Sequence, residues 1–170
     1  MGVRAATPDD SEAIAAVGTA TWHDTYDEII GREAVEERVA EWYDPETVRG
    51  YFEDDAFGAY VATRDGDVVG YAYSRPAGEV DVWSLPAIYV HPDAQGEGFG
   101  GALLARVEQD ACEADASVVR LAVLAANDRA CGFYEAHGYE QVDERDVPTV
   151  DGTRELVYET TEPATSRSPL

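Results

Sequence analysis

The sequence predicts a single domain of the mixed α/β (α+β) class, and three observations support this. The chain has 170 residues, of which 45% are hydrophobic, so one domain with a sizeable core is expected. Two alternating apolar segments flank Asp65-Gly66, which is a strong β-hairpin signal. A β-branched run, a glycine-rich turn and a helical pattern then follow one another from Val80 to Ala116.

The N-terminal part is predicted to contain one strand and three helices. Thr7 is a good helix cap, Pro8 suits the first helical position, and acidic residues fill the first turn. The expected elements are a strand at Val3–Ala6, a helix from Thr7 to about Ala20, and helices at Arg32–Trp42 and Pro45–Glu53.

The remaining elements are predicted to be mainly strands with two helices. They are strands at Ala59–Thr63, Val68–Tyr73, Val80–Val90, Val118–Leu124, Tyr139–Val147 and Thr153–Thr160, and helices at Gly98–Ala116 and Asn127–His137. The last residues are rich in Pro, Ser and Thr. We therefore expect a domain over residues 1–160 and a flexible tail over residues 161–170.

The charge indicates a saline environment. The formal net charge is −23, and all twelve basic residues are arginines. Such a chain repels itself unless salt screens the charge, and the Debye length falls to about 3 Å at 1 M. These features predict a halophile, and they disfavour binding to nucleic acid or to an anionic membrane.

The location predicted from composition is the cytoplasm. No segment is long and apolar enough to span a bilayer, and no secretory leader opens the chain. The two cysteines, Cys112 and Cys131, fall on expected helices rather than at the spacings of a disulfide framework.

The segment from Ile88 to Glu108 predicts an anion site. Four glycines occur within six residues, between a strand and the start of a helix. Glycine allows positive φ and close backbone approach, and a helix N-terminus presents free N–H groups and a positive dipole end. This arrangement suits a phosphate or a diphosphate.

These glycines match two sequence motifs, in two different registers. Gly96 to Gly101 fits G-x-G-x-x-G, the dinucleotide fingerprint, but helices and a hairpin precede it where a βαβ unit should begin. A Walker A loop is excluded because the chain has no lysine. The other register, Gln95 to Gly100, reads [Q/R]-x-x-G-x-[G/A].

In that register the chain resembles the GNAT superfamily, the Gcn5-related N-acetyltransferases. The run from Asn127 to Tyr139 resembles the family's second hallmark, N-x-x-A-x-x-F-Y-x-x-x-G-F/Y, and it follows about thirty residues later. The resemblance extends from Val3 to about Thr160. It implies a GNAT fold: a mixed, mostly antiparallel sheet of six to seven strands, flanked by about four helices and splayed in the middle for CoA.

The resemblance also implies an activity, namely acetyl transfer from acetyl-CoA to a primary amine within a ternary complex, without a metal. The acceptor would be a small-molecule amine or a peptide N-terminus. Many relatives form dimers, so a homodimer is an open alternative for this chain. A polyamine or aminoglycoside would suit an acidic pocket, but at this net charge almost any pocket would look acidic. Two alternatives remain: a catalytically inactive CoA-binding module and a dinucleotide-dependent oxidoreductase.

The cofactor-binding residues carried over from the family are mainly backbone groups. Ile88 and Val90 would pair with the pantetheine arm, and an N–H near Val90 would polarise the thioester carbonyl. The amides from Gln95 to Gly101 would hold the diphosphate; the residues assigned there are Gln95, Gly96, Gly98, Gly100 and Gly101. Asn127 matches a cofactor-contacting asparagine, although it would equally serve as a helix cap.

Tyr134 matches the family's general acid, which protonates the departing thiolate. His23 and Tyr26 are candidates for the acceptor site, whereas Trp22 is expected to be packed in the core. Many relatives carry a glutamate base eleven residues before the [Q/R] position, and here that residue is Ser84. Glu79, Asp81, His23 or a water chain could replace the base, so none is assigned.

Overall fold

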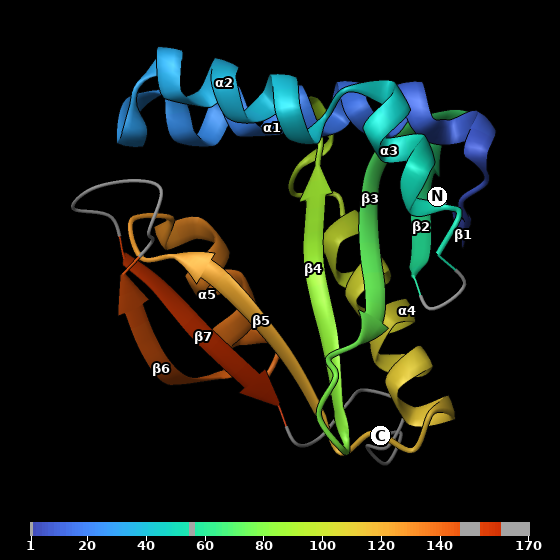
Figure 1. The fold of residues 1–170 in the computed structure, drawn as a ribbon, viewed down its shortest axis with the longest axis vertical. Helices are drawn as coiled ribbons and strands as arrows, with labels where there is room; N and C mark the ends of the chain where they lie inside the picture. The colour runs from blue at the N-terminus through green and yellow to red at the C-terminus, as the bar shows by residue number, and fades with distance from the viewer. Residues whose placement is uncertain (1, 55–56, 147–153, 161–170) are drawn as a thin grey trace.

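The computed structural model describes residues 2–54, 57–146 and 154–160, and its centre is a seven-stranded sheet. The spatial order is β1-β2-β3-β4-β5-β7-β6. The strands are β1 (Gly2–Ala5), β2 (Gly58–Arg64), β3 (Asp67–Pro76), β4 (Val82–Val90), β5 (Val118–Leu124), β6 (Glu140–Asp146) and β7 (Arg154–Thr160). Every neighbouring pair is antiparallel except β4 and β5, which are parallel. The predicted mixed, mostly antiparallel sheet is confirmed (Figure 1).

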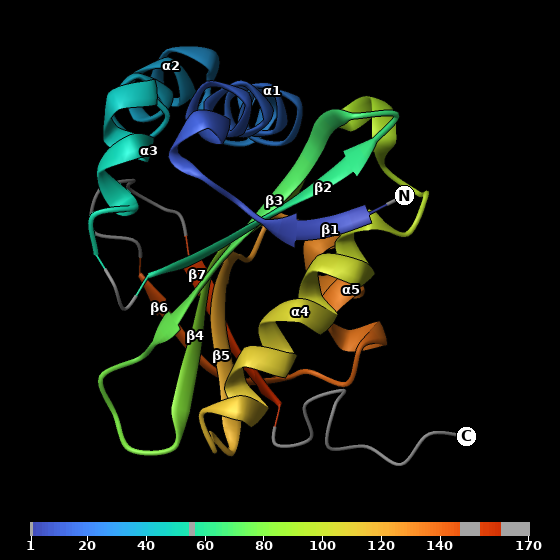
Figure 2. The same cartoon turned by 90° about the vertical axis from the view of Figure 1, so that its right-hand side faces the viewer.

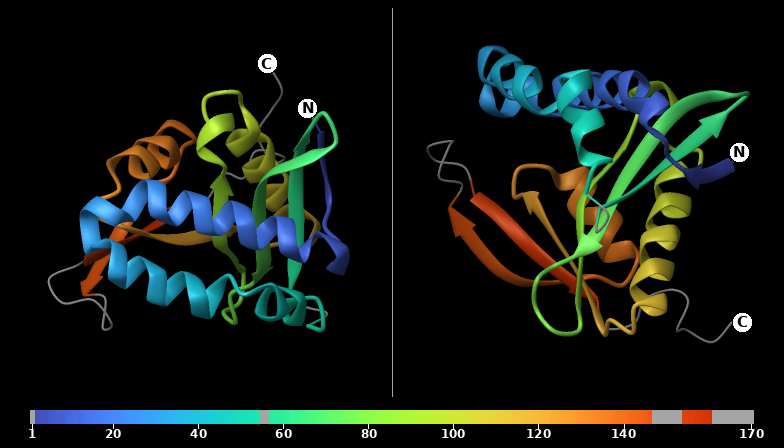
Figure 3. Two further views of the ribbon diagram at one scale, coloured as in Figure 1. Left: turned by 90° about the horizontal axis from the view of Figure 1, so that it is seen from above. Right: turned by 45° about the vertical axis from the view of Figure 1, so that its right-hand side comes forward.

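Five α-helices in the described residues cover the two faces of the sheet, which agrees with the five helical segments predicted along the chain; the family resemblance implies about four. They are α1 (Ser11–Ile30), α2 (Arg32–Trp42), α3 (Pro45–Tyr51), α4 (Phe99–Glu113) and α5 (Asp128–Ala136). Figures 2 and 3 show α1, α2 and α3 together on one side, with α4 and α5 on the other. None of the helices in the described part of the chain is long and apolar enough to cross a membrane.

The first helix is longer than predicted. A short 3-10 turn (Pro8–Asp10) leads into α1, which continues through Trp22 and Tyr26 to Ile30 instead of ending near Ala20. No glycine or proline interrupts the segment after Ala20, and Trp22 and Tyr26 lie four residues apart on the buried face. Gly31, with φ of 93°, ends the helix.

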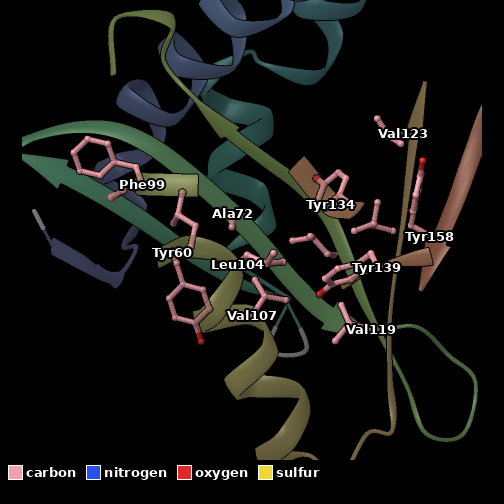
Figure 4. Packing of buried hydrophobic residues seen from close by; sticks show 14 of the residues in the cluster. Tyr60, Ala72, Phe99, Leu104, Val107, Val119, Val123, Tyr134, Tyr139 and Tyr158 are labelled. Atoms are coloured by element: carbon pink, nitrogen blue, oxygen red, sulfur yellow. The ribbon is translucent and has the colours of Figure 1, made fainter. Parts of the chain in front are cut away.

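The two-residue alternation of β2 separates two cores. Tyr60 and Ala62 face α4 and α5, whereas Ala59 and Val61 face α1, α2 and α3. Figure 4 shows the first core, in which Tyr134, Tyr139 and Tyr158 gather beside the side chains from α4. Burial of both faces fixes the register of the central strands.

The sheet opens between β4 and β5. These strands pair at Val82–Ser84 with Val118–Arg120, and beyond that point they separate (Figure 1). Pro86 lies in β4 just past the paired segment and has no N–H to donate, and the β3–β4 register shifts at Tyr73/Arg75. The predicted splay in the middle of the sheet is confirmed.

Two strand ends also differ from the predictions. β4 begins at Val82 rather than Val80, whose side chain is 89% exposed, because Asp81 adopts a positive φ of 66°. β3 extends to Pro76, where a loop was expected. The segment between the last two predicted strands, which includes Asp151-Gly152 as the expected turn, and the tail at residues 161–170 lie outside the described residues.

Candidate active site

A groove of about 690 Å³ occupies the opening between β4 and β5. Its lining comes from α1 and α2 on one face of the sheet, from β4 and β5, and from α5 and the start of α4 on the other face. Eight predicted site residues line it: Tyr26, Ser84, Ile88, Val90, Gln95, Gly100, Asn127 and Tyr134. His23, Gly96, Gly98 and Gly101 are not among its lining residues.

The backbone of β4 presents unpaired groups to this groove. The N–H of His91 donates to the carbonyl of Val69 at 2.7 Å, so the groups of His91 face β3. In an antiparallel ladder successive residues face opposite sides, so the N–H and C=O groups of Ile88 and Val90 point into the opening. These positions can pair with an extended ligand as an added strand would.

Part of this edge is already occupied by the chain itself. The carbonyl of Val90 accepts hydrogen bonds from Gln95 Nε2 at 3.0 Å and from Thr21 Oγ1 at 3.3 Å. The Gln95 side chain thus folds back and closes the turn between β4 and α4. The group that Val90 keeps for a ligand is its N–H.

The glycine turn has the backbone that an anion site requires at two positions. Gly96 and Gly98 have φ of 85° and 92°, where a side chain would be strained. Gly98 caps α4 without a side chain, so the first-turn N–H groups stay available to a ligand.

Gly100 and Gly101 differ from the expectation of positive φ, because both lie inside α4. A Cβ on Gly100 would be 3.2 Å from the Phe133 ring, and one on Gly101 would be 3.4 Å from His137 Nε2. These glycines therefore let α5 pack closely against the start of α4. That contact brings the second sequence motif beside the first.

Tyr134 lies on α5 with 7% of its surface exposed, and it lines the groove. Burial, and after it the nearby Tyr26, raise the pKa of Tyr134. The phenol is therefore protonated at neutral pH. Within the described part of the chain its hydroxyl has no hydrogen-bonding partner, which leaves the proton available to a ligand.

Asn127 connects the two faces of the sheet. Its Oδ1 accepts from the N–H of Ala130 at 3.1 Å and caps α5, while its Nδ2 donates to Tyr26 OH at 3.0 Å. Tyr26 itself is buried, which raises its pKa, so its own proton is still present at neutral pH. The pair holds α1 and α5 together at the groove.

The wall on the α1 side is aromatic. Trp22 packs on Tyr26 and Trp42, with ring centroids 4.4 Å and 5.3 Å apart, so it is both a packing residue and part of the lining. His23 points elsewhere and pairs with Asp27 at 2.8 Å. Sequence reasoning missed Trp42 and Tyr73, because nothing along the chain shows that α2 and β3 reach the groove.

Ser84 occupies the position of the family's glutamate, and no replacement suggested by the sequence lines the groove. Glu79 forms an ion pair with Arg120 at 3.0 Å, and the Asp81 carbonyl accepts from Ser117 and Val118. Among the described residues that line the groove, Glu155 is the single carboxylate, and it is bound by Arg145.

The groove is rich in positive charge, unlike the rest of the molecule. The chain has 35 acidic residues and twelve arginines, and five of those arginines line the groove: Arg38, Arg75, Arg120, Arg129 and Arg145. This groove therefore differs from the expectation that almost any pocket of this chain would look acidic. No group of three or more potential metal ligands occurs among the described residues.

Comparison with known proteins agrees with this geometry. Residues 16–139 match the model of the acetyltransferase (GNAT) family. An acetyltransferase of Pectobacterium atrosepticum is 33% identical over 105 residues, which are 60% of this chain and 72% of that protein. Both motifs of the groove lie within the matched region.

Solved structures share the fold. A PaiA N-acetyltransferase from Thermoplasma acidophilum, solved with coenzyme A, superposes with a TM-score of 0.81 at 20% identity, covering 95% of this chain and 99% of that one. A ribosomal-protein-alanine N-acetyltransferase from Brucella melitensis gives a TM-score of 0.71 at 25% identity over 95% and 99% of the two chains. The chain belongs to the acetyltransferase (GNAT) family and is an N-acetyltransferase.

Proposed function

We propose that this chain transfers the acetyl group of acetyl-CoA directly to a primary amine while both substrates are bound. The observation that supports this most strongly is the groove itself, which is lined from both faces of the sheet. One end meets the glycine turn and α5, and the other meets the aromatic wall of α1 and α2. Two substrates can therefore approach each other through the splay.

Coenzyme A would occupy the end of the groove next to α4. The free N–H groups at Gly98 to Gly101 and the helix dipole would bind its diphosphate. The pantetheine arm would run along β4 and pair with the exposed groups of Ile88 and Val90. The Val90 N–H would polarise the thioester carbonyl as negative charge develops on its oxygen.

In the reaction the neutral amine nitrogen attacks the thioester carbonyl carbon, and the C–S bond breaks after a tetrahedral intermediate. The sulfur takes a proton from the Tyr134 hydroxyl. The proton that the nitrogen loses passes to solvent, and solvent returns one to the Tyr134 oxygen, so the reaction gives an amide and free thiol without net proton release. No side-chain base is assigned, because Ser84 replaces the usual glutamate. The acceptor must therefore arrive as the free amine.

Two alternatives are weaker. An inactive CoA-binding module would explain Ser84, but it would leave the protonated, groove-facing Tyr134 without a role. A dinucleotide-dependent oxidoreductase carries its fingerprint in a doubly wound, mainly parallel sheet, whereas among the described strands only β4 and β5 pair in parallel and the other neighbours, β3 and β4 included, are antiparallel.

We also propose a halophilic host and a cytoplasmic location. The support is the net charge of −23, which only concentrated salt makes tolerable, and the absence of disulfides between the two free cysteines.

The test is turnover of acetyl-CoA with a panel of primary amines in molar KCl, compared between the wild type and Tyr134→Phe. We expect the variant to lose about 10- to 100-fold in kcat, at or below the lower end for general acid catalysis because a thiolate is a good leaving group. The KM for acetyl-CoA and the melting temperature should stay unchanged.

Tyr158→Phe is the matched control, because Tyr158 is a buried tyrosine of the same cluster that does not line the groove. It should retain full kcat. Unchanged kcat in Tyr134→Phe would remove that residue from the mechanism, and tight CoA binding without turnover of any amine would favour the inactive module.

A further inference from the structure

Building on the proposed function, we propose that the acceptor amine carries an anionic group, a carboxylate or a phosphate, which binds to a donor cluster formed by Tyr73, Arg75 and Ser84. All three residues line the groove at the closed end of the splay, where β4 and β5 still pair. The cluster offers a guanidinium and two hydroxyls.

The strand register places Ser84 in one row with two arginines, while Tyr73 lies two residues before Arg75 on β3 and opposite Ala87. Arg75 on β3 lies opposite Ser84 on β4, and Ser84 lies opposite Arg120 on β5. Residues paired across neighbouring strands point to the same face, so two arginines flank the serine at the position where relatives carry a glutamate. The two arginines would neutralise the carboxylate of a glutamate at this position. With serine in its place, they can attract an anionic group of a ligand instead.

Arg75 supplies the available charge of this row. Arg120 is already held by Glu159 at 2.6 Å and by Glu79 at 3.0 Å. Arg75, by contrast, has no ion-pair partner within the ranges that the structure covers. Arg75 is therefore the arginine of this row whose guanidinium is available to a ligand.

Tyr73 gives independent support. It is 6% exposed, and its hydroxyl is a buried polar atom without a hydrogen-bonding partner among the described residues. Burial raises the pKa of Tyr73, so the group keeps its proton and acts as a donor. A buried donor without a partner is costly, and an acceptor oxygen from a ligand would satisfy it.

The cluster therefore offers one positive charge and two hydroxyls that can donate, and it contains no carboxylate, which suits a carboxylate or phosphate and disfavours a polyamine. An amine whose anionic group binds here would extend its nitrogen along β4 toward the thioester. Substrates of this kind are amino acids and aminoalkyl phosphates.

The experiment uses acceptor pairs that differ only in the anionic group, at fixed ionic strength. One pair is an amino acid and its amide, and the other is an aminoalkyl phosphate and the corresponding amino alcohol. We expect the wild type to prefer one of the anionic members by about tenfold or more in kcat/KM, and the preferred pair identifies carboxylate or phosphate.

Arg75→Gln should reduce kcat/KM for the anionic member by about 10- to 100-fold, the range for losing a hydrogen bond to a charged group, and leave its neutral counterpart unchanged. Tyr73→Phe should act in the same direction, and Arg75→Lys should restore part of the preference. The KM for acetyl-CoA should not change in any of them.

Two control variants match these changes. Arg32→Gln removes one positive charge from an exposed pair with Glu36 on α2, away from the groove. Tyr71→Phe removes a buried hydroxyl from the same strand without touching the lining. Both should retain the wild-type preference.

A preference for the neutral member, an equal loss on both members in Arg75→Gln, or a rise in the KM for acetyl-CoA would each overturn the proposal; the last would assign Arg75 to the phosphates of CoA. If no amine is acetylated, the proposed function fails separately. Calorimetric binding of the same anions to the CoA complex, with and without Arg75→Gln, then still decides the inference.

Discussion

Asp10 is the residue whose ionisation most clearly supports the N-terminal part of the fold. Its carboxylate accepts from Arg4 NH1 and NH2 at 2.8 Å and 2.9 Å and from the Thr7 N–H at 2.8 Å. The Arg4 hydrogen bond is the main reason that the pKa of Asp10 is lowered. One side chain thereby ties β1 to the turn that begins α1.

A lowered carboxylate pKa contributes stability above the unfolded-state pKa, and that contribution is lost as the pH falls through the folded-state pKa. Asp10→Asn should therefore lower the free energy of unfolding by about 1–2 kcal/mol at pH 7, as expected for a lost cap. The difference from the wild type should shrink below about pH 4, where an ordinary aspartate becomes protonated. Thermal unfolding from pH 7 to pH 3 measures this.

Glu12→Gln is the control for the loss of one negative charge, since Glu12 is exposed in the first turn of α1, two residues after Asp10. It should show no comparable loss at pH 7. A difference between Asp10→Asn and the wild type that grows toward acid would contradict this account.

For single residues, the sequence predicted the groove-lining residues that belong to its two motifs. It missed those that come from other strands and helices. Tyr134 and Asn127 were found because their spacing to Phe133 and Ala130 forms a recognisable pattern. Tyr73 and Arg75 carry no such pattern. Their position in the groove follows from the register of β3 with β4 and from the burial of Tyr73, which are properties of the assembled sheet.

The element on which the proposed cofactor binding depends is α4 with the turn before it. Gly98 has φ of 92°, and nothing lies within 4 Å of the position that a Cβ would take. Substitution would therefore strain the backbone without causing a clash. The strain of a left-handed residue costs about 1–2 kcal/mol, and relieving it would rotate the N–H groups away from the diphosphate.

Gly98→Ala should accordingly weaken CoA binding by about tenfold as well as lower the melting temperature. Gly31→Ala is the matched control, because Gly31 has φ of 93° and equally open space but lies between α1 and α2. It should lose stability with unchanged CoA affinity. Equal CoA affinity in the two variants, measured by calorimetry, would show that the glycine turn does not contribute to cofactor binding.

The order and type of the elements could be predicted from the sequence, because hairpin turns, caps and periodicity are local signals. Arg32–Trp42 and Val118–Leu124 were predicted with the observed bounds. The end of α1 was not, since the predicted helix stops near Ala20 and the observed one continues to Ile30. Packing of Trp22 and Tyr26 in the core beside the sheet, which is a tertiary contact, supports the additional turns.

The whole molecule combines a very acidic surface with a groove lined by arginines. In the described part of the chain most arginines outside the groove are paired, as with Arg64 and Glu97 at 2.6 Å, and the acidic groups far outnumber them. Mutual repulsion of the excess carboxylates opposes folding at low ionic strength.

Raising KCl from 0.1 M to 2 M should therefore raise the melting temperature by about 5 °C or more, equivalent to roughly 1–2 kcal/mol for a domain of this size. Circular dichroism measures the transition. The same melting temperature at both concentrations, or a lower one at 2 M, would refute the halophilic interpretation while leaving the site unaffected.

In the proposed mode of cofactor binding, the main-chain amides of the glycine turn bind the diphosphate of coenzyme A, and the pantetheine arm lies in the splay. A crystal structure of the chain grown with coenzyme A at molar KCl tests this directly. We predict diphosphate oxygens about 3 Å from N–H groups between Gln95 and Gly101, with the arm hydrogen-bonded to Ile88 or Val90. Coenzyme A bound elsewhere, with the turn empty or filled by side chains, would contradict the account.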